Sequence, residues 1–232
     1  MSTQSNTTAT TNGALPRARI EVKNITKTFP TRDGLVTAIR HVNLEALDQE
    51  FTCIVGPSGC GKSTLFNIIA GLLEPTSGEI LVDGKSIAGS KSGRIGYMQQ
   101  KDLLIPWRTV MENVTIGLEI QHRPRAEAQE SAHKYLQLFG LQRYADSYPT
   151  SLSGGMKQRV ALMRTLAMGQ DVILMDEPFQ SLDYPTRIAL ETDLLDMVRD
   201  LKKTVLFVTH DIDEAVSIAD KVYVLSKGPG TV

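Results

Sequence analysis

A glycine-rich segment from Gly56 to Thr64, with the sequence GPSGCGKST, constrains the fold of this chain more than any other feature. It follows a short apolar run, Phe51 to Val55, and leads into a helical pattern that begins at Lys62. Strand, glycine-rich loop and helix in this order form a phosphate-binding loop, in which backbone N–H groups and the helix dipole attract phosphate oxygens. The candidate phosphate-binding residues are Gly56, Pro57, Ser58, Gly59, Cys60, Gly61, Lys62, Ser63 and Thr64.

Two side chains of this loop supply chemistry that the backbone cannot. Lys62 places a cation beside the β- and γ-phosphates of a nucleotide, and Ser63 offers a hydroxyl to Mg²⁺, which prefers oxygen ligands. Cys60 is expected to be a small spacer. The alternative is a glycine-rich turn without a ligand, which becomes rare once a strand and a helix flank the complete motif. The loop therefore predicts nucleotide binding without identifying the reaction.

Short β-branched apolar runs elsewhere in the chain predict the core. They are too short for helices and are apolar on both faces, as in parallel strands covered by helices on both sides. Helical patterns lie between or after them, which predicts a doubly wound α/β fold with a P-loop NTPase (RecA-like) core. The expected strands are 51–55, 172–175, 205–208 and 222–225, and the expected helices are 62–71, 185–201 and 212–219, the last capped by Asp211.

Two parts of the chain depart from this alternation. Residues 20–47 and 79–82 alternate apolar and polar side chains, with a turn at Asp33–Gly34, and predict a small antiparallel β subdomain as short strands. Residues from about 101 to 168 contain no convincing strand, but apolar side chains recur there at helical spacing. An inserted helical subdomain is therefore expected to interrupt the α/β core, with its apolar stripes facing a core.

Composition places the chain among ordinary globular proteins. Apolar residues make up 41%, charged residues 22%, and the net charge of -1 argues against a broad nucleic-acid-binding face. Cys53 and Cys60 are too few for a disulfide framework and are expected to be reduced thiols. No apolar run approaches the roughly 18 residues of a membrane span. The Ser-, Thr- and Asn-rich start lacks the apolar run of a secretory signal, so residues 1–18 are expected to form a disordered tail.

A pair of carboxylates follows one of the expected core strands. Residues 172–175 run directly into Asp176 and Glu177. Ligands of parallel sheets gather outside the carboxyl ends of the strands, so both carboxylates are expected near the phosphates. Asp176 is then placed to hold Mg²⁺, directly or through water, and Glu177 to orient or deprotonate an attacking water. Acidic residues that merely begin a loop are common, but phosphoryl transfer needs such groups beside a phosphate loop.

A second anion-binding pattern lies in the helical region. Ser153 stands where it can cap a helix, and Gly154 and Gly155 leave backbone N–H groups open at the start of that helix. A capped surface helix is the plain alternative. Because the chain already has one complete phosphate loop, one solution is that the second site serves the nucleotide of another copy.

On these motifs the chain resembles the nucleotide-binding subunits of ATP-binding cassette (ABC) transporters, from about residue 19 to residue 228. In that family, residues 152–158 correspond to the signature motif. The resemblance implies an ATPase that uses ATP and Mg²⁺ in a head-to-tail dimer, either a homodimer or a pair of ABC subunits. Ser153 and Gly155, with Gly154 between them, would contact the nucleotide held by the partner's phosphate loop. It also implies one ABC ATPase domain over residues 19–232, with the helical subdomain at about 101–168 and no room for a regulatory C-terminal domain.

The resemblance assigns further site residues one at a time. Gln100 occupies the Q-loop position, which contacts Mg²⁺ and the attacking water. His210, at the end of an expected strand, matches the switch histidine that contacts the γ-phosphate. Asp183 matches the D-loop at the dimer interface, and Phe29 matches the aromatic residue that stacks on adenine, with a hydrophobic strand-end residue as the alternative. Gln180 departs from the family, which usually has a small residue there.

One stretch of the helical region indicates the kind of transporter. Residues 101–114, which include Trp107, resemble those of importers of the nitrate, sulfonate, taurine and bicarbonate group. The resemblance implies that this region faces a membrane permease, where an exposed Trp107 would be an anchor, although a Trp buried in the helical subdomain fits the sequence equally well. It further implies a peripheral motor on the cytoplasmic face of the membrane, with a solute-binding protein as an indirect partner and no nucleic acid. The alternative is a soluble ABC ATPase that acts on a non-membrane partner.

Overall fold

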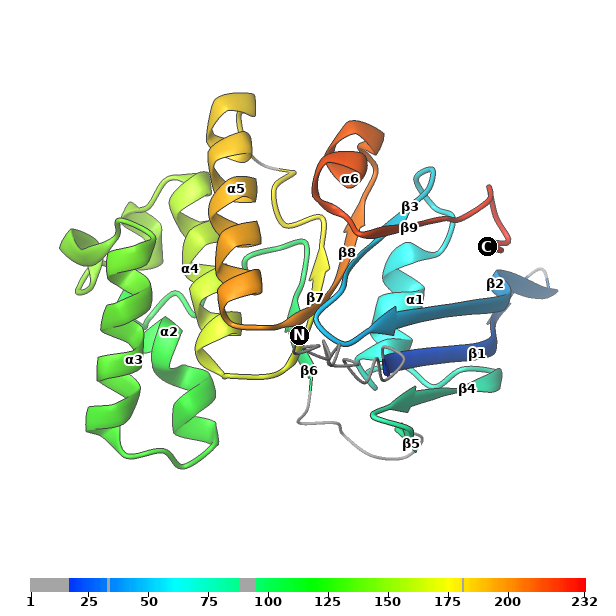
Figure 1. Ribbon diagram of the computed structural model, residues 1–232, viewed down its shortest axis with the longest axis horizontal. Helices are drawn as coiled ribbons and strands as arrows, with labels where there is room; N and C mark the ends of the chain where they lie inside the picture. Colours follow the sequence, from blue (N-terminus) through cyan, green and yellow to red (C-terminus); the bar gives the residue numbers. More distant parts are fainter. Residues whose placement is uncertain (1–16, 33, 88–94, 181) are drawn as a thin grey trace, which may run out of the picture.

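The computed structural model describes residues 17–32, 34–87, 95–180 and 182–232. The expected disordered tail lies, apart from its last two residues, outside this part of the chain, as does Asp33 of the expected turn. The described residues form two sheets (Figure 1). The larger is a parallel sheet in the order β6-β7-β8-β3-β9, whose strands are β3 (Phe51–Val55), β6 (Ile95–Met98), β7 (Val172–Asp176), β8 (Thr204–Thr209) and β9 (Lys221–Val224).

Both faces of the parallel sheet are buried along β3, β6, β7 and β8, as the sequence predicted. The edge strand β9 exposes Val222 and Val224, which corrects the expectation for that strand. Along β3, Cys53 packs into one hydrophobic cluster and its neighbour Ile54 into the other. Met175 and Leu174 of β7 divide in the same way, because successive strand side chains point to opposite faces. One cluster joins the sheet to helices α2 to α6, and the other joins it to α1 and the antiparallel sheet. Strand β3, which leads into the phosphate loop, is therefore held between two separate cores.

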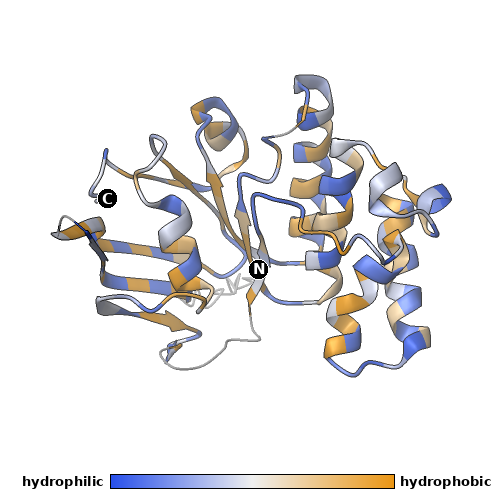
Figure 2. Ribbon diagram, turned by 180° about the vertical axis from the view of Figure 1, so that it is seen from behind, coloured by the Kyte–Doolittle hydropathy of each residue, from blue (hydrophilic) through white to orange (hydrophobic). Residues whose placement is uncertain are grey.

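The smaller sheet is antiparallel, in the order β2-β1-β4-β5. Its first two strands are long rather than short, which corrects the expectation, and they pair along most of their length. Figure 2 shows hydrophilic and hydrophobic residues alternating along this sheet, whereas the central parallel strands are hydrophobic throughout. The strands are β1 (Ala18–Thr31), β2 (Gly34–Leu47), β4 (Ser77–Val82) and β5 (Lys85–Ser86).

Three helices, α2 to α4, follow β6 and precede β7 in the chain. They pack on one another and lie on the far side of the molecule from the antiparallel sheet (Figure 1). Helix α1 lies between the two sheets, and α5 and α6 cover the opposite face of the parallel sheet. The helices are α1 (Lys62–Ile69), α2 (Val110–Ile120), α3 (Arg125–Leu138), α4 (Gly154–Ala167), α5 (Tyr184–Asp200) and α6 (Ile212–Ile218), and two 3₁₀ turns cover Gln142–Tyr144 and Pro149–Ser151.

The elements differ from the sequence expectations at a few places. The expected helices agree to within two residues at either end, and Asp211 caps α6 by accepting hydrogen bonds from the backbone N–H groups of Asp213 and Glu214. Strand β6 and helix α2 were not predicted as elements. Within the described ranges, no helix combines the length and apolar character needed to cross a membrane.

Candidate active site

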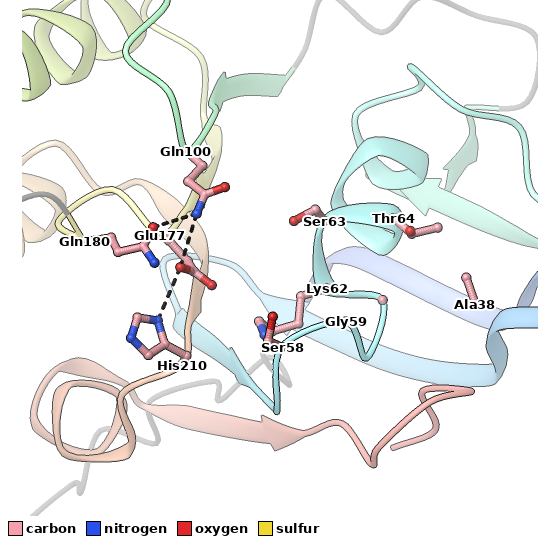
Figure 3. Close-up of a pocket in the computed structure, with 11 residues that line it drawn as sticks. Ala38, Ser58, Gly59, Lys62, Ser63, Thr64, Gln100, Glu177, Gln180 and His210 are labelled. Carbon is pink, nitrogen blue, oxygen red and sulfur yellow. Dashed lines mark hydrogen bonds and ion pairs between the residues drawn. The ribbon is translucent and has the colours of Figure 1, made fainter.

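A pocket of about 490 Å³ opens at the carboxyl ends of the parallel strands. One wall is the loop that leads from β3 into α1, and the facing wall comes from the loops after β6, β7 and β8 (Figure 3). This is the edge at which α/β sheets bind ligands. The lining residues are Ala38, Ser58, Gly59, Gly61, Lys62, Ser63, Thr64, Gln100, Glu177, Gln180 and His210.

Two glycines allow the phosphate loop to fit against its neighbours. Gly61 has a φ of 105°, and a Cβ placed there would overlap the side chain of Ile39 and lie 2.9 Å from the Ala38 carbonyl oxygen. A Cβ on Gly56 would lie 2.8 Å from both Cys60 Sγ and the Leu225 carbonyl oxygen. Real Cβ atoms do not approach other atoms so closely, so both positions need glycine. Cys60 is buried and serves as the small packing residue that the sequence predicted.

Lys62 is buried at the start of α1, and its Nζ donates hydrogen bonds to the carbonyl oxygens of Gly56, at 2.7 Å, and Pro57, at 3.3 Å. Carbonyl dipoles are weak compensation for a buried cation, and the Asp176 carboxylate adds to them, so an anion bound in the pocket would meet a cation that is ready to receive it. Among the described residues, no side chain caps α1 at Gly61. The first N–H groups of the helix are therefore open to a ligand in the pocket that Gly61 and Lys62 line. The loop is therefore built to hold phosphate.

The opposite wall centres on Glu177, whose side chain is only 14% exposed. His210 Nδ1 lies 3.2 Å from Glu177 Oε2, and Gln100 Nε2 lies 3.5 Å from the same oxygen (Figure 3). Gln100 Nε2 also donates to Gln180 Oε1 at 2.6 Å. Glu177 itself has a φ of 47°, a left-handed conformation that is uncommon for residues other than glycine and often marks functional sites. The loops after β6 and β8 thus bring Gln100 and His210 onto the Glu177 carboxylate, which the loop after β7 carries.

Asp176 ends β7 and is 5% exposed. Burial raises the pKa of its carboxyl group, and the charge of Glu177 adds to this, while the Ser63 hydroxyl, the charge of Lys62 and the Tyr97 hydroxyl act in the opposite direction. Burial also raises the pKa of Tyr97, and the neighbouring Asp176 carboxylate raises it further. The last residue of β7 and the first turn of α1 therefore meet at the floor of the site.

The donors gathered here fit Mg²⁺. Ser63 supplies a hydroxyl oxygen, Asp176 a carboxylate and Gln100 an amide oxygen, and all three are the hard ligands that Mg²⁺ prefers. In the described part of the chain, no group of three or more His, Cys, Asp or Glu side chains could hold a metal by itself. A magnesium ion in this site would therefore take its remaining ligands from phosphate and water, as is usual for nucleotide sites.

Nine predicted site residues do not line the pocket, and five of them lie outside both the phosphate loop and the end of β7. Ser153 caps α4 and accepts a hydrogen bond from the Met156 N–H group, with Gly154 and Gly155 following in the first turn. Asp183 caps α5 and accepts from the Thr186 N–H group, which lowers the pKa of its carboxyl group. Phe29 is exposed on the β1–β2 hairpin, where it pairs with Val36 on the strand that carries Ala38. The five residues are Phe29, Ser153, Gly154, Gly155 and Asp183, and the other four are Gly56, Pro57, Cys60 and Asp176.

Two lining residues were not predicted from the sequence. Ala38 reaches the pocket because β2 runs beside the phosphate loop, and nothing in its local sequence indicates this. Gln180 was treated as a departure from the family pattern, yet it accepts the hydrogen bond of Gln100. Its position three residues after Glu177, in the loop that leaves β7, was the available signal.

A parallel sheet with a phosphate loop between strand β3 and helix α1, facing carboxylates at the end of strand β7, defines a P-loop nucleotide hydrolase. A family model described as "ABC transporter" matches residues 39–180, and the chain belongs to this family.

Individual relatives agree with the family assignment. An uncharacterized ABC transporter ATP-binding protein of Methanocaldococcus jannaschii is 48% identical over 216 residues, which are 93% of this chain and 80% of that protein. The nitrate import ATP-binding protein NrtD of Synechocystis is 44% identical over 92% of this chain and 80% of its own length. The bicarbonate transport ATP-binding protein CmpD of the same organism is 41% identical over 96% of this chain and 79% of its own length.

Solved structures extend the agreement to the fold. A dimeric bacterial ABC transporter cassette has a TM-score of 0.83 and 36% identity, over 92% of this chain and 96% of that chain. A post-hydrolysis form of that cassette with ADP and phosphate has a TM-score of 0.82 and 35% identity, over the same shares of both chains. The expected family, fold class and ATP-binding ATPase activity are therefore confirmed.

Proposed function

We propose that the chain is the ATP-hydrolysing motor subunit of an importer that moves a small anion, of the nitrate, sulfonate or taurine kind, through a separate membrane permease. The printed names of two relatives, a nitrate import protein and a bicarbonate transport protein, support the direction and the substrate class. The observation that carries the hydrolytic part is the convergence of Gln100 and His210 on Glu177, opposite Lys62.

The residues divide the chemistry among them. Lys62 and the loop amides bind the β- and γ-phosphates, and Phe29 supplies a stacking surface for adenine. Ser63, Asp176 and Gln100 would hold Mg²⁺, which neutralises phosphate charge. Glu177 orients the attacking water and accepts its proton, since a carboxylate is the general base within reach of the pocket. His210 holds the Glu177 carboxylate and reaches toward the γ-phosphate.

Two copies are needed for a complete site in this proposal. Ser153, Gly154 and Gly155 lie outside the pocket of their own chain, and an anion-binding helix start with no ligand in its own chain fits the nucleotide of a partner. The similar cassette of known structure is described as dimeric. We therefore propose a head-to-tail homodimer or a pair of ABC subunits, with Asp183 at the interface.

The membrane side of the proposal rests on the helical region. Trp107 is 77% exposed and Leu103 is 52% exposed. Trp107 therefore lies on the surface and is not buried in the helical subdomain. Exposed aromatic and aliphatic side chains of this size are typical of protein interfaces. We propose that they contact permease subunits at the cytoplasmic face of the membrane, with a solute-binding protein as an indirect partner and no nucleic acid.

Glu177→Gln tests the hydrolytic assignment. The amide keeps the size of the side chain but cannot accept a proton, so we expect ATP turnover to fall roughly 10²- to 10⁴-fold while ATP binding is retained. Glu130→Gln is the matched control, because Glu130 lies on the exposed surface of α3, where it pairs with Lys134. ATP hydrolysis at the wild-type rate in Glu177→Gln would remove Glu177 from its assigned role.

Affinity purification of the chain from membranes tests the importer assignment. We expect a multispanning permease to co-purify, and to be lost when Trp107 is replaced by Glu. Recovery of ribosomal or nucleic-acid partners alone would favour the second candidate, a soluble ABC ATPase that acts on a non-membrane partner. Uptake of labelled nitrate, sulfonate or taurine by vesicles that contain the recovered complex then separates the substrates.

A further inference from the structure

The segment that leaves the active site at Gln100 is held by side chains of helix α4. Arg164 donates from Nη1 to the Leu103 carbonyl oxygen at 2.7 Å and from Nη2 to the Asp102 carbonyl oxygen at 2.6 Å. One turn and a half earlier on the same helix, the buried Gln158 places its Nε2 3.4 Å from the Gln100 carbonyl oxygen. Helix α4 is the helix that Ser153 caps. The segment and the helix are thus joined at three backbone carbonyl groups, those of Gln100, Asp102 and Leu103.

The Arg164 contacts depend on the shape of a guanidinium group. Its two terminal nitrogens form a planar fork that can hold two neighbouring carbonyl groups at once, whereas a lysine ammonium is a single point. Burial lowers the pKa of Arg164, and the charge of Asp102 opposes this effect. Leu103 has a φ of 47°, a conformation that an aliphatic residue keeps only where its surroundings hold it. Arg164 supplies that constraint at the Leu103 carbonyl.

Helix α2 holds the other end of the segment. Asn113 is fully buried, and its Oδ1 accepts the Ile105 N–H at 2.7 Å while its Nδ2 donates to the carbonyl oxygens of Ile105, Arg108 and Thr109 at 2.9 to 3.1 Å. Between these two anchors the exposed side chains of Leu103 and Trp107 point outward. The surface formed by Leu103 and Trp107 is therefore held by hydrogen bonds to α4 and α2. The segment that carries it begins at Gln100, which lines the pocket.

We propose that Arg164 is a positioning residue that makes the Leu103–Trp107 surface move with helix α4, so that nucleotide in the pocket changes the surroundings of Trp107. The inference rests on the proposed function only for what this surface does at the membrane. Gln100 transmits the change, because its amide would engage the nucleotide and Mg²⁺ through its oxygen while its Nε2 is hydrogen-bonded to Gln180 and Glu177. Without the fork, Asp102 and Leu103 are free to move independently of α4.

Trp107 is the sole tryptophan of the chain and reports on this surface without a label. The test measures acrylamide quenching of Trp107 emission in the purified full chain, with and without Mg²⁺ and the non-hydrolysable ATP analogue AMP-PNP. Wild type should show a nucleotide-dependent change, and Arg164→Lys should lose most of it while binding AMP-PNP with an affinity within about threefold of wild type, measured by calorimetry. Arg159→Lys is the matched control, because Arg159 lies on the same helix but donates to the Phe139 carbonyl oxygen beside α3.

The outcomes separate cleanly. An unchanged nucleotide response in Arg164→Lys, an equal loss in Arg159→Lys, or no response in wild type would each overturn the proposal. Loss of AMP-PNP binding in Arg164→Lys would overturn it as well, since Arg164 would then shape the pocket itself. If Arg164→Lys does not fold, Gln158→Leu removes only the contact to the Gln100 carbonyl and should reduce the same response. None of these measurements depends on a permease, so their failure leaves the importer proposal standing.

Discussion

Glu214 and Glu191 place two carboxyl groups in the buried contact between α6 and α5, directly behind the loop that carries His210. Glu214 is 9% exposed and Glu191 is 5% exposed. The pKa of Glu214 is raised to about 7, chiefly by burial; the charge of Glu191 and its hydrogen bond to Glu214 act in the same direction, while the Thr209 hydroxyl and Arg187 oppose the shift. From β3, the Cys53 thiol faces the same carboxyl group, and burial with the Glu214 charge raises the pKa of that thiol. At mildly acidic pH the folded protein therefore keeps a proton on Glu214.

The sign and size of the effect follow from this shift. In the unfolded chain Glu214 ionises near its usual pKa of 4.5, and in the folded chain near about 7. Between these values the folded state holds a proton that the unfolded state has released, so the free energy of unfolding falls as pH rises. A difference of this size corresponds to on the order of 3 kcal/mol, fully present at low pH and lost once the pH passes the folded pKa. The Glu214→Gln variant has no such proton to lose.

Urea unfolding of wild type and Glu214→Gln at intervals from pH 5 to pH 8.5 measures the difference. We expect wild type to lose about 2 to 3 kcal/mol relative to the variant across this range. Glu191→Gln should weaken the dependence, because it removes the neighbouring charge. Asp213→Asn, an exposed change on the same helix, should leave it intact. Parallel stability curves for wild type and Glu214→Gln would refute a buried, protonated Glu214.

Gly61→Ala should cost about 2 to 3 kcal/mol in urea unfolding and weaken nucleotide binding, because it combines a φ of 105° with a Cβ 2.9 Å from the Ala38 carbonyl oxygen. Gly140→Ala is its control, since Gly140 also has a positive φ but a Cβ there meets no described heavy atom within 4 Å; a cost as large as that of Gly61→Ala would contradict the close-contact argument. Asn113→Asp should lower the free energy of unfolding by about 3 kcal/mol at pH 7, because three carbonyl oxygens would then face a carboxylate in place of an amide donor. An unchanged thermal midpoint for Asn113→Asp would contradict the assigned hydrogen bonds.

The elements that the sequence predicted are those governed by local rules. The phosphate loop, the strand that ends at Asp176 and the Asp211 cap each depend on a few adjacent residues. Strand β6 escaped prediction because it has only four residues, includes Gly96, and is a strand through its pairing with β7, some 77 residues away at Ile95 and Val172. Pairing over such a distance leaves no periodic signal in the sequence.

Helix α2 escaped prediction for a different reason. It contains the β-branched residues Val110, Val114, Thr115 and Ile116, together with Gly117, all of which weaken helix propensity. Packing overrides that weakness, since a Cβ at Gly117 would overlap the Met168 side chain at the end of α4. The capping box formed by Thr109 and Glu112 was the local signal available, and it marks the helix start correctly.

The same distinction applies to the active site. Asp176 and Glu177 could be placed from physical reasoning, because a strand end beside a phosphate loop lies at the binding edge of the sheet. The same rule indicates His210, which follows the expected strand 205–208, but it does not indicate Gln100, which follows a strand that was not predicted. Family resemblance supplied Gln100 and the role of His210, and the structure brings both residues to the same Glu177 oxygen. Gln180 fits this cluster although it departs from the family pattern.

The loop at Ser153 shows how far one chain can account for its own residues. Ser153 has a partner within the chain, and Gly155 approaches Leu182, where a Cβ would lie 3.1 Å from the Leu182 Cδ2 atom. Packing within the chain does not require glycine at position 154, because among the described residues a Cβ on Gly154 would meet no heavy atom within 4 Å. Glycine in a helix costs roughly 1 kcal/mol relative to alanine, so an open glycine is best explained by something outside the chain that approaches its backbone. The γ-phosphate held by a second copy meets that requirement, and the proposed dimer thus explains a residue that the isolated fold does not.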